Sequence, residues 1–179
     1  RRTSHDLVAV ETPGTMVSVD SRVPNALVGE ALASRSLPGL GSYDRVRSEQ
    51  RWGTSRLDFR LLGGAGEALV EVKGCTLVEP DGLALFPDAP TSRGARHVRE
   101  LADAARAGIA AHVVVVVQRS DGRLFAPNDR TDPDFGDALR EAADAGVSVM
   151  ALSTRVTREG VDLWGTVPVD LEAARRSMT

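Results

Sequence analysis

Cysteine, aromatic side chains and long apolar runs are all scarce in this sequence. Cys75 is the single cysteine, which excludes a disulfide within the chain and so a disulfide-stapled scaffold. The longest apolar stretch, around residues 113–117, is far shorter than the roughly 20 residues that a membrane-spanning helix needs. The N-terminus also lacks the apolar segment and cleavage site of a signal peptide. We therefore expect a soluble, cytoplasmic protein without membrane contact.

Lysine is nearly absent as well. Of the 22 basic residues, 21 are arginine, and Lys73 is the only lysine. A codon bias toward arginine explains the many arginines but leaves the one exception to be accounted for. An ammonium group is a compact charge whose proton can be tuned, which a guanidinium group cannot imitate. Lys73 therefore directs attention to its neighbours.

The rest of the composition is that of an ordinary globular domain. The chain has 179 residues, of which 42% are apolar, and a formal net charge of -3. This length is sufficient for one domain with a substantial core. Because position 1 is arginine and not methionine, we expect the chain to be part of a longer protein.

Apolar periodicity predicts helices alternating with strands. Residues 112–117 form a nearly continuous β-branched run, which is typical of a strand buried on both faces. Asn25 is a suitable cap for the first helix, and residues 63–66 are a suitable hairpin turn. This order predicts an α/β fold in which a mixed central sheet is flanked by helices. We expect helices at 26–36, 92–107, 134–145 and 170–179, and strands at 15–19, 55–62, 69–77, 83–86, 112–117, 147–153 and 161–169.

The lysine belongs to a cluster that could carry chemistry. Glu71 and Lys73 are two apart on a predicted strand, so their side chains point to the same face. Asp58, on the preceding strand, can lie beside Glu71, and two such carboxylates repel unless a cation lies between them. Mg²⁺ binds through carboxylate oxygens and waters and can polarise a phosphate. With Lys73 to orient the attacking water, the cluster predicts phosphodiester hydrolysis.

Acidic residues also have simpler interpretations. On spacing alone, Glu71 and Lys73 could equally form a solvated ion pair on an edge strand. Four aspartates farther along resemble a calcium loop in their spacing but lack its glycine and terminal glutamate, which favours turn and N-cap roles. These aspartates are Asp129, Asp132, Asp134 and Asp137.

Three blocks of the sequence resemble the sugar fermentation stimulation protein A family. The first block comprises residues 43–49 and 53–59, the second residues 70–77 and the third residues 85–101. Shorter matches are Val-Pro-Asn at 23–25 and Phe-Ala-Pro-Asn at 125–128. The resemblance spans roughly residues 15–155, and the third block is long enough to make coincidence unlikely.

This resemblance implies a DNA-binding protein with a restriction-endonuclease-like, PD-(D/E)XK nuclease domain. It places Asp58, Glu71 and Lys73 at the catalytic positions of the nuclease motif. Glu49 is the additional acid, so Asp58, Glu71 and Glu49 are the implied ligands of Mg²⁺ or Mn²⁺.

The resemblance also implies a domain organisation. Members of the family begin with an OB-fold domain, whereas this chain starts near the expected junction. We expect residues 1–20 to be that interdomain junction or a remnant of the OB-fold domain. Residues 21–170 are the expected nuclease-like domain, and residues 171–179 a C-terminal helix or tail. Without the charged groove and stacking aromatics of an OB-fold, we expect the chain to bind nucleic acid poorly.

Several basic side chains are candidate nucleic-acid contacts. Arg93 and His97 lie one turn apart on the helix predicted at 92–107, where a helix start can bind phosphate. Arg47 and Arg56 belong to a cluster of five arginines between residues 45 and 60. A helix cap and solvated ion pairs are the alternative.

The sequence therefore predicts a DNA-binding protein with a magnesium-dependent nuclease site, and a homodimer is a candidate assembly. The alternative is a non-catalytic DNA-binding regulator of sugar metabolism in which the acidic cluster is a structural or cation site. A domain that binds another phosphorylated ligand is the third interpretation.

Overall fold

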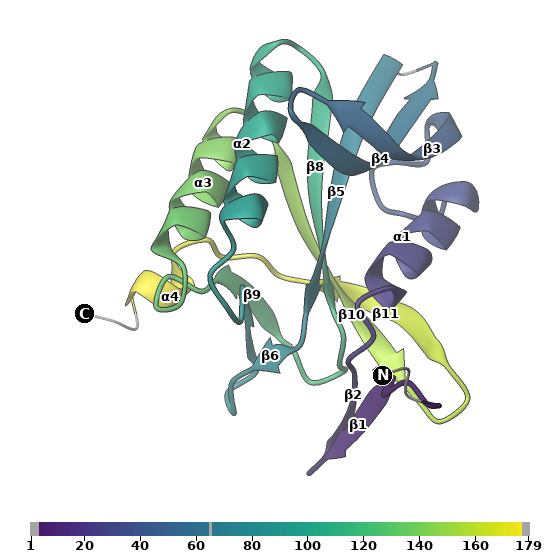
Figure 1. The fold of residues 1–179 in the computed structure, drawn as a ribbon, viewed down its shortest axis with the longest axis vertical. Coiled ribbons are helices and arrows are strands. Elements are labelled where there is room, and N and C mark those ends of the chain that lie inside the picture. The colour runs from purple at the N-terminus through teal and green to yellow at the C-terminus, as the bar shows by residue number, and fades with distance from the viewer. Residues whose placement is uncertain (1–3, 65, 177–179) are drawn as a thin grey trace.

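A six-stranded mixed sheet forms the centre of the computed structural model, which describes residues 4–64 and 66–176. Its strand order is β11-β10-β8-β5-β4-β3 (Figure 1). β5, β8 and β10 are parallel, and the outer strands are antiparallel to their neighbours. The strands are β3 (Tyr43–Trp52), β4 (Ser55–Gly63), β5 (Gly66–Cys75), β8 (Ala110–Val117), β10 (Ser148–Val156) and β11 (Val161–Val167).

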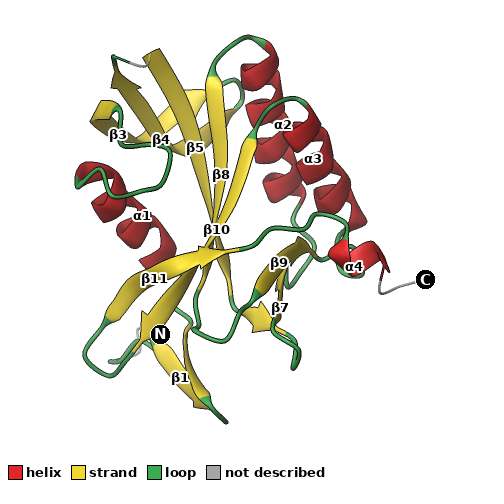
Figure 2. Cartoon of the chain, turned by 180° about the vertical axis from the view of Figure 1, so that it is seen from behind, coloured by secondary structure: helices red, strands yellow, loops and turns green. Residues whose placement is uncertain are grey.

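Helices cover both faces of this sheet (Figure 2). α2 (Ser92–Arg106) and α3 (Pro133–Asp144) pack together on one face, and α1 (Val23–Ala33) packs on the other. The valines of β8 alternate between the two cores, which explains why this strand is apolar throughout. The predicted mixed sheet flanked by helices is therefore confirmed.

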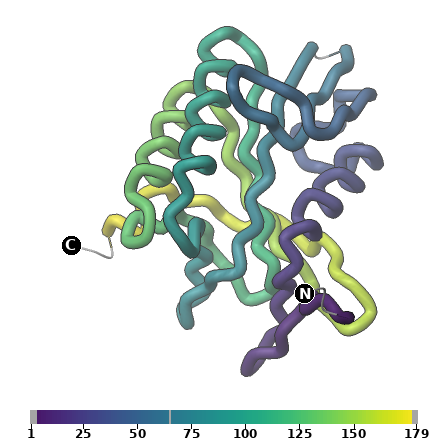
Figure 3. The backbone as a smooth tube through the Cα atoms, viewed as in Figure 1, coloured from purple at the N-terminus to yellow at the C-terminus, as the bar shows by residue number. Residues whose placement is uncertain are grey.

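Two smaller sheets lie outside the central one. β1 (Ala9–Thr12) and β2 (Thr15–Ser18) form an N-terminal hairpin, which Figure 3 shows at the end of the molecule opposite the β3–β4 hairpin. The other sheet has the order β6-β7-β9 and packs against α4. Its strands are β6 (Leu77–Val78), β7 (Leu83–Phe86) and β9 (Leu124–Pro127), and the helix α4 comprises Ala173–Arg176.

Most predicted elements appear, with some corrections. The strand predicted at 83–86 is β7, but it belongs to the small sheet and not to the central one. β3 was not predicted, because its exposed positions carry mainly charged side chains, as is common for edge strands. α1 begins before Asn25, so Asn25 is not its cap. Residue 65 of the predicted turn and residues 177–179 of the predicted terminal helix lie outside the described residues.

Side chains fix the starts of the two packed helices. Thr91 caps α2 by accepting a hydrogen bond from Gly94 N at 3.0 Å. Asp132 caps α3 through Phe135 N at 3.0 Å and also accepts from Thr91 N at 2.7 Å. The N-cap role predicted for Asp132 is confirmed, and the same carboxylate joins both helix starts.

None of the helices within the described residues has the length and apolarity that crossing a bilayer requires.

Candidate functional site

The site begins where β4 and β5 stop pairing. Their backbone register runs from Gly63 opposite Gly66 to Phe59 opposite Val70. At the next position, the Asp58 Oδ2 atom accepts a hydrogen bond from Val72 N at 2.7 Å. A carboxylate thus takes the place of a backbone carbonyl in the ladder, and this places Asp58 beside β5.

The first turn of α1 supplies a second donor to this carboxylate. Asn25 Nδ2 donates to Asp58 Oδ1 at 2.7 Å. The turn can lie this close because residue 74 is glycine: a Cβ there would be 2.9 Å from Pro24 Cγ and 2.4 Å from Gln118 Oε1. Asn25 was missed as a site residue, although it belongs to the Val-Pro-Asn match at 23–25, which was the available signal.

Glu71 lies in the interior, on the part of β5 beyond this point. Its side chain is only 4% exposed, and its Oε1 atom accepts two hydrogen bonds. Lys73 Nζ donates at 2.7 Å, and His97 Nδ1, from α2, lies at 2.5 Å. Within the described residues no hydrogen bond reaches the other oxygen, Oε2, which is buried. Glu71 is therefore buried. The alternative interpretation, in which Glu71 and Lys73 form a solvated ion pair on an edge strand, does not describe it.

The pKa shifts show that the charge of Glu71 acts on Asp58. Burial raises the pKa of Asp58, and the negative charge of Glu71 raises it further. The hydrogen bonds from Val72 and Asn25 and the charge of Lys73 oppose this rise. For Glu71, burial alone would raise the pKa, but the hydrogen bond from His97 and the charge of Lys73 lower it. Lys73 thus contacts Glu71 directly, and both of these charges act on Asp58; the joint catalytic role of the three residues stays a prediction.

These residues fit a mostly hydrated cation. Within the parts of the chain that the structure describes, no group of three or more His, Cys, Asp or Glu side chains could hold a metal ion by itself. Two carboxylates remain: Glu71 has a buried oxygen without a hydrogen-bond partner among the described residues, and burial disfavours the charged form of Asp58. Mg²⁺ is typically bound by one or two carboxylates and retains several waters. Asp58 and Glu71 are its candidate ligands.

Glu49, predicted as a third ligand, forms an ion pair at the surface. It lies on β3 with a positive φ of 52°. Arg56 Nη2 is 2.9 Å from its Oε2, and both side chains are about two-thirds exposed, at 65% and 66%. A surface hollow of about 520 Å³ lies beside this pair, lined by Glu49, Arg51, Thr54, Ser55 and Arg56. The structure thus places Glu49 in a basic environment at the β3–β4 hairpin.

The predicted nucleic-acid contacts fall into two groups. Arg47 and Arg56 are exposed on the β3–β4 hairpin, where Arg47 is paired across the strands with Arg60. Arg93 is exposed on the first turn of α2, and its Nε atom donates to His97 Nε2 at 3.4 Å. His97 itself is 3% exposed. Its contact with nucleic acid stays a prediction, and the partners that the structure gives its ring are Glu71 and Arg93.

Glu100 lies one turn after His97 and fastens α2 to the β3–β4 turn. Its carboxylate accepts hydrogen bonds from Thr54 Oγ1 at 2.6 Å, Thr54 N at 3.3 Å and Ser55 N at 3.2 Å. The arginine-bearing hairpin and the helix that carries His97 are therefore joined at a fixed point near the acidic pair.

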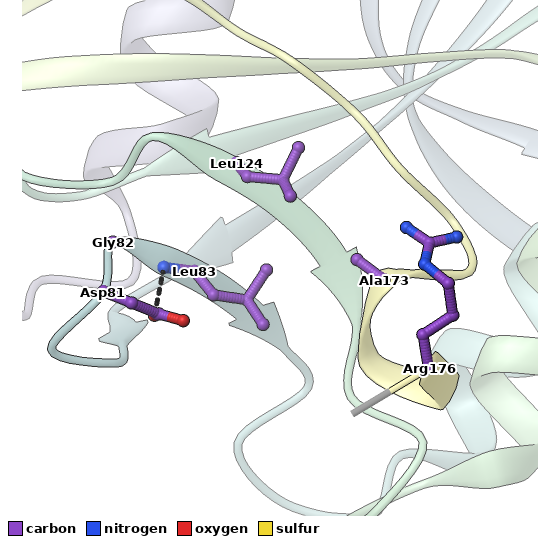
Figure 4. Close-up of a pocket in the computed structure, with 6 residues that line it drawn as sticks. All are labelled: Asp81, Gly82, Leu83, Leu124, Ala173 and Arg176. Atoms are coloured by element: carbon purple, nitrogen blue, oxygen red, sulfur yellow. Dashed lines mark hydrogen bonds between the residues drawn. The ribbon is translucent and has the colours of Figure 1, made fainter. Parts of the chain in front are cut away.

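A separate pocket of about 330 Å³ lies between the small sheet and α4 (Figure 4). Its lining includes Asp81, whose Oδ1 accepts a hydrogen bond from Leu83 N at 3.0 Å, together with Leu124 and Arg176. None of the predicted site residues lines it. Cys75 is not a candidate nucleophile, because burial raises the pKa of its thiol to about 12.

The comparisons with known proteins all identify the same family. The profile of the family "Sugar fermentation stimulation protein RE domain" matches residues 22–160. The sugar fermentation stimulation protein homolog of Chloroflexus aurantiacus is 46% identical over 169 residues, covering 94% of this chain and 65% of the relative. The homolog from Symbiobacterium thermophilum is 46% identical over 176 residues, covering 96% of this chain and 70% of the relative.

The chain also matches a solved structure of Pyrococcus furiosus SfsA in complex with Ca²⁺. The TM-score is 0.86 at 31% identity, covering 92% of this chain and 71% of that one. The chain therefore spans about two-thirds of the length of the Chloroflexus relative, at 65%, and somewhat more of the others.

Proposed function

Because the chain belongs to the sugar fermentation stimulation protein family, we propose that it binds DNA and hydrolyses phosphodiester bonds with Mg²⁺ or Mn²⁺ at Asp58, Glu71 and Lys73. The observation that carries this proposal is the Oε2 atom of Glu71, which is buried and has no hydrogen-bond partner among the described residues. Lys73, the only lysine of the chain, contacts the other oxygen, and the charge of Glu71 raises the pKa of Asp58. A buried carboxylate oxygen without a donor requires a partner, and a divalent cation is the partner that also relieves the repulsion between the two acids.

Each residue has a distinct role in the proposed reaction. A bound Mg²⁺ ion would polarise the scissile phosphate and lower the pKa of a bound water. Asp58 and Glu71 would hold the ion, and the donors on their other lone pairs orient the two carboxylates. Lys73, whose side chain is 12% exposed, donates to Glu71, and its ammonium group would orient the attacking water or offset charge growing on the phosphate.

The resemblance of the sequence to PD-(D/E)XK nucleases supports this assignment, since Asp58, Glu71 and Lys73 match the motif. The Pyrococcus furiosus relative was solved in complex with Ca²⁺. Calcium is a hard cation that prefers oxygen ligands, as magnesium does. A divalent cation in this chain is consistent with that observation.

The arginines of the β3–β4 hairpin support DNA as the substrate. Arg47 and Arg56 are exposed, and the α2 residue Glu100 holds their hairpin next to the helix that contacts Glu71. Duplex DNA presents a closely spaced row of phosphates, and arginine contacts to them position the backbone without reading the bases. The hairpin would thus direct a phosphate toward the acidic pair.

Incubation with supercoiled plasmid and with oligonucleotides, in Mg²⁺ or Mn²⁺, tests the proposal. The parent protein should cleave, and Glu71→Ala and Lys73→Ala should each lose at least about 100-fold in rate. Glu141→Gln, on the exposed surface of α3, is the control and should cleave as the parent does. Equal rates in the parent and in the Glu71 and Lys73 variants would remove the nuclease proposal.

One observation favours the second candidate, a non-catalytic DNA-binding regulator. Within the described residues the acids do not form a group of three metal-holding side chains. For a regulator, Glu71→Ala would leave DNA binding unchanged and no variant would cleave. Binding would weaken with salt in proportion to the number of phosphate contacts.

A further inference from the structure

We propose that His97 is a positioning residue that holds Glu71 with its Oε2 atom toward the cation, and that Arg93 fixes the ring form that allows this. The inference rests on the proposed function, because it concerns the same acidic pair. It differs from the sequence prediction, in which His97 contacts nucleic acid.

The hydrogen bonds of Glu71 are distributed unevenly between its two oxygens. His97 Nδ1 and Lys73 Nζ both lie within 2.7 Å of Oε1, at 2.5 and 2.7 Å. Oε2 receives no hydrogen bond from the described residues and is buried. Two donors from different elements on one oxygen fix the rotation of the carboxylate. The other oxygen is then aimed at whatever ligand enters the site, as in the outer shell of many metal centres.

Arg93 determines which nitrogen of His97 carries the proton. A guanidinium group has only donors, and its Nε atom lies 3.4 Å from His97 Nε2. The Nε2 atom must therefore accept, which leaves Nδ1 to carry the hydrogen and donate to Glu71. The chain of donors runs from Arg93 through His97 to Glu71.

The position of the ring is also fixed from both ends of its helix. Before His97, Thr91 caps α2, and Asp132 accepts a hydrogen bond from Thr91 N. After it, Glu100 holds the helix to Thr54 and Ser55. A side chain on such a restrained helix can place its donor reproducibly, which is what ligand positioning requires.

Burial argues against a direct phosphate contact in this arrangement. The His97 side chain is 4% exposed, and both of its ring nitrogens have partners within the protein. Any buried imidazole needs partners for its nitrogens, so a packing role and a positioning role share these contacts. The test must therefore separate a lost donor from lost packing.

His97→Asn and His97→Leu make this separation in the full chain. An asparagine amide can place a donor near the position of Nδ1, whereas leucine fills space without one. With Mn²⁺ alone as the probe, titrated by its EPR signal, His97→Leu should bind about 10- to 100-fold more weakly and His97→Asn should recover most of the loss. In cleavage assays the leucine variant should lose kcat while the KM for DNA is unchanged.

Two results would overturn the inference while leaving the proposed function intact. One is equal Mn²⁺ affinity in the parent, His97→Leu and His97→Asn. The other is a rise in the KM for DNA with kcat unchanged, which would assign His97 to substrate binding. If the parent binds no Mn²⁺ at all, the proposed function fails and the cation-directed part of the inference fails with it, whereas the ring form of His97 still tests whether His97 donates to Glu71.

Long-range ¹H–¹⁵N correlation spectra of the metal-free protein report that ring form. The inference requires a proton on Nδ1 and none on Nε2, and a proton on Nε2 alone would overturn it with or without a metal. Arg93→Leu should release Nε2 and mix the two forms, and it provides a second variant if His97→Leu does not fold. Arg99→Leu, an arginine on the same helix that pairs with Asp134, should leave the spectrum unchanged.

Discussion

Two buried acidic groups in this protein are stabilised in different ways. The Glu71 cluster contains Asp58, Glu71, Lys73 and His97, and the Asp129 cluster contains Asp129, Asp137, Arg140 and Arg175. Asp129 has a side chain that is 2% exposed, which is as buried as Glu71. In the Asp129 cluster, however, Arg140 donates to both oxygens of Asp129, and Arg175 Nε lies 3.5 Å from Oδ1.

The difference lies in the geometry of the cations. A guanidinium group presents a planar fork of donors that satisfies both oxygens of a carboxylate at once. An ammonium group and one imidazole nitrogen, by contrast, both contact a single oxygen of Glu71. In a chain with 21 arginines, the use of lysine at this position therefore leaves a carboxylate oxygen free for a ligand. We infer that the Asp129 cluster stabilises the fold and that the Glu71 cluster binds a cation.

The largest expected effect is on the Asp129 cluster. Asp129→Ala should lower the free energy of unfolding by about 3 to 5 kcal/mol, because the largely buried Arg140 guanidinium loses its main partner. Urea denaturation at neutral pH measures the change. Asp137→Ala, whose side chain is 62% exposed, is the control and should cost about 1 kcal/mol or less. Equal losses in the two variants would mean that Asp129 is not the centre of a structural network.

The second expected effect is stabilisation by a bound cation, which we expect only at the Glu71 cluster. Mn²⁺ at 100 times its Kd should raise the free energy of unfolding by about 2.7 kcal/mol, because the ion binds only the folded chain. Glu71→Gln should abolish this increase, and Asp137→Ala should retain it. Thermal unfolding with and without the ion measures both. A full increase in Glu71→Gln would place the cation elsewhere.

A third prediction concerns His112, a half-buried residue for which we assign no ligand. His112 lies on β8 next to Val70, and its buried Nδ1 atom has no hydrogen-bond partner among the residues that the structure describes. Burial lowers the pKa of His112 from its ordinary value of 6.5, so the unfolded chain takes up a proton at a higher pH than the folded protein. Its contribution to stability is therefore complete above pH 6.5 and decreases as the pH falls below that value.

His112→Leu should remove this pH dependence and raise the free energy of unfolding by about 1 kcal/mol near pH 5.5. Urea denaturation at about pH 7.5 and about pH 5.5 gives the comparison. His5→Gln, at an exposed position, is the control and should behave as the parent does. If the stability of His112→Leu depended on pH as that of the parent does, His112 would have a hydrogen-bond partner in solution.

The smallest expected effect decides whether the Glu71 cluster has a third acid. Glu49 is paired with Arg56 in solvent, so Glu49→Gln should change Mn²⁺ affinity by less than about twofold and stability by less than about 0.5 kcal/mol. The same EPR titration and urea denaturation apply. A tenfold loss of affinity would establish Glu49 as the additional ligand that the family resemblance implies.

Local patterns were sufficient to predict much of this fold. The valine run of β8, the hairpin of β4 and β5 and the helical period of α2 each depend on side chains that are near one another in sequence. β3 lacks such a pattern, because it is an edge strand whose exposed side chains are mainly charged. The pairing of β7 with β9 joins segments about 40 residues apart, which no local period encodes.

The candidate site likewise combines contacts that local patterns predict with contacts that depend on packing. Strand alternation and the hairpin were sufficient to place Lys73 against Glu71 and Asp58 against β5. The contact of Asn25 with Asp58 crosses 33 residues, and that of His97 with Glu71 crosses 26. Both depend on how two helices pack against opposite faces of the sheet, so the residue types could be noticed in the sequence but their partners could not.

A side chain protects the amide proton of Val72 from solvent exchange. Its acceptor is the Asp58 side chain and not a carbonyl of a neighbouring strand, so its solvent exchange rate depends on the rotamer of one carboxylate. Opening of the whole sheet exposes ladder amides together, whereas rotation of Asp58 would expose this amide alone. The backbone of the protein thus contains a site-specific reporter, readable without any label, of whether Asp58 has turned toward an incoming ion.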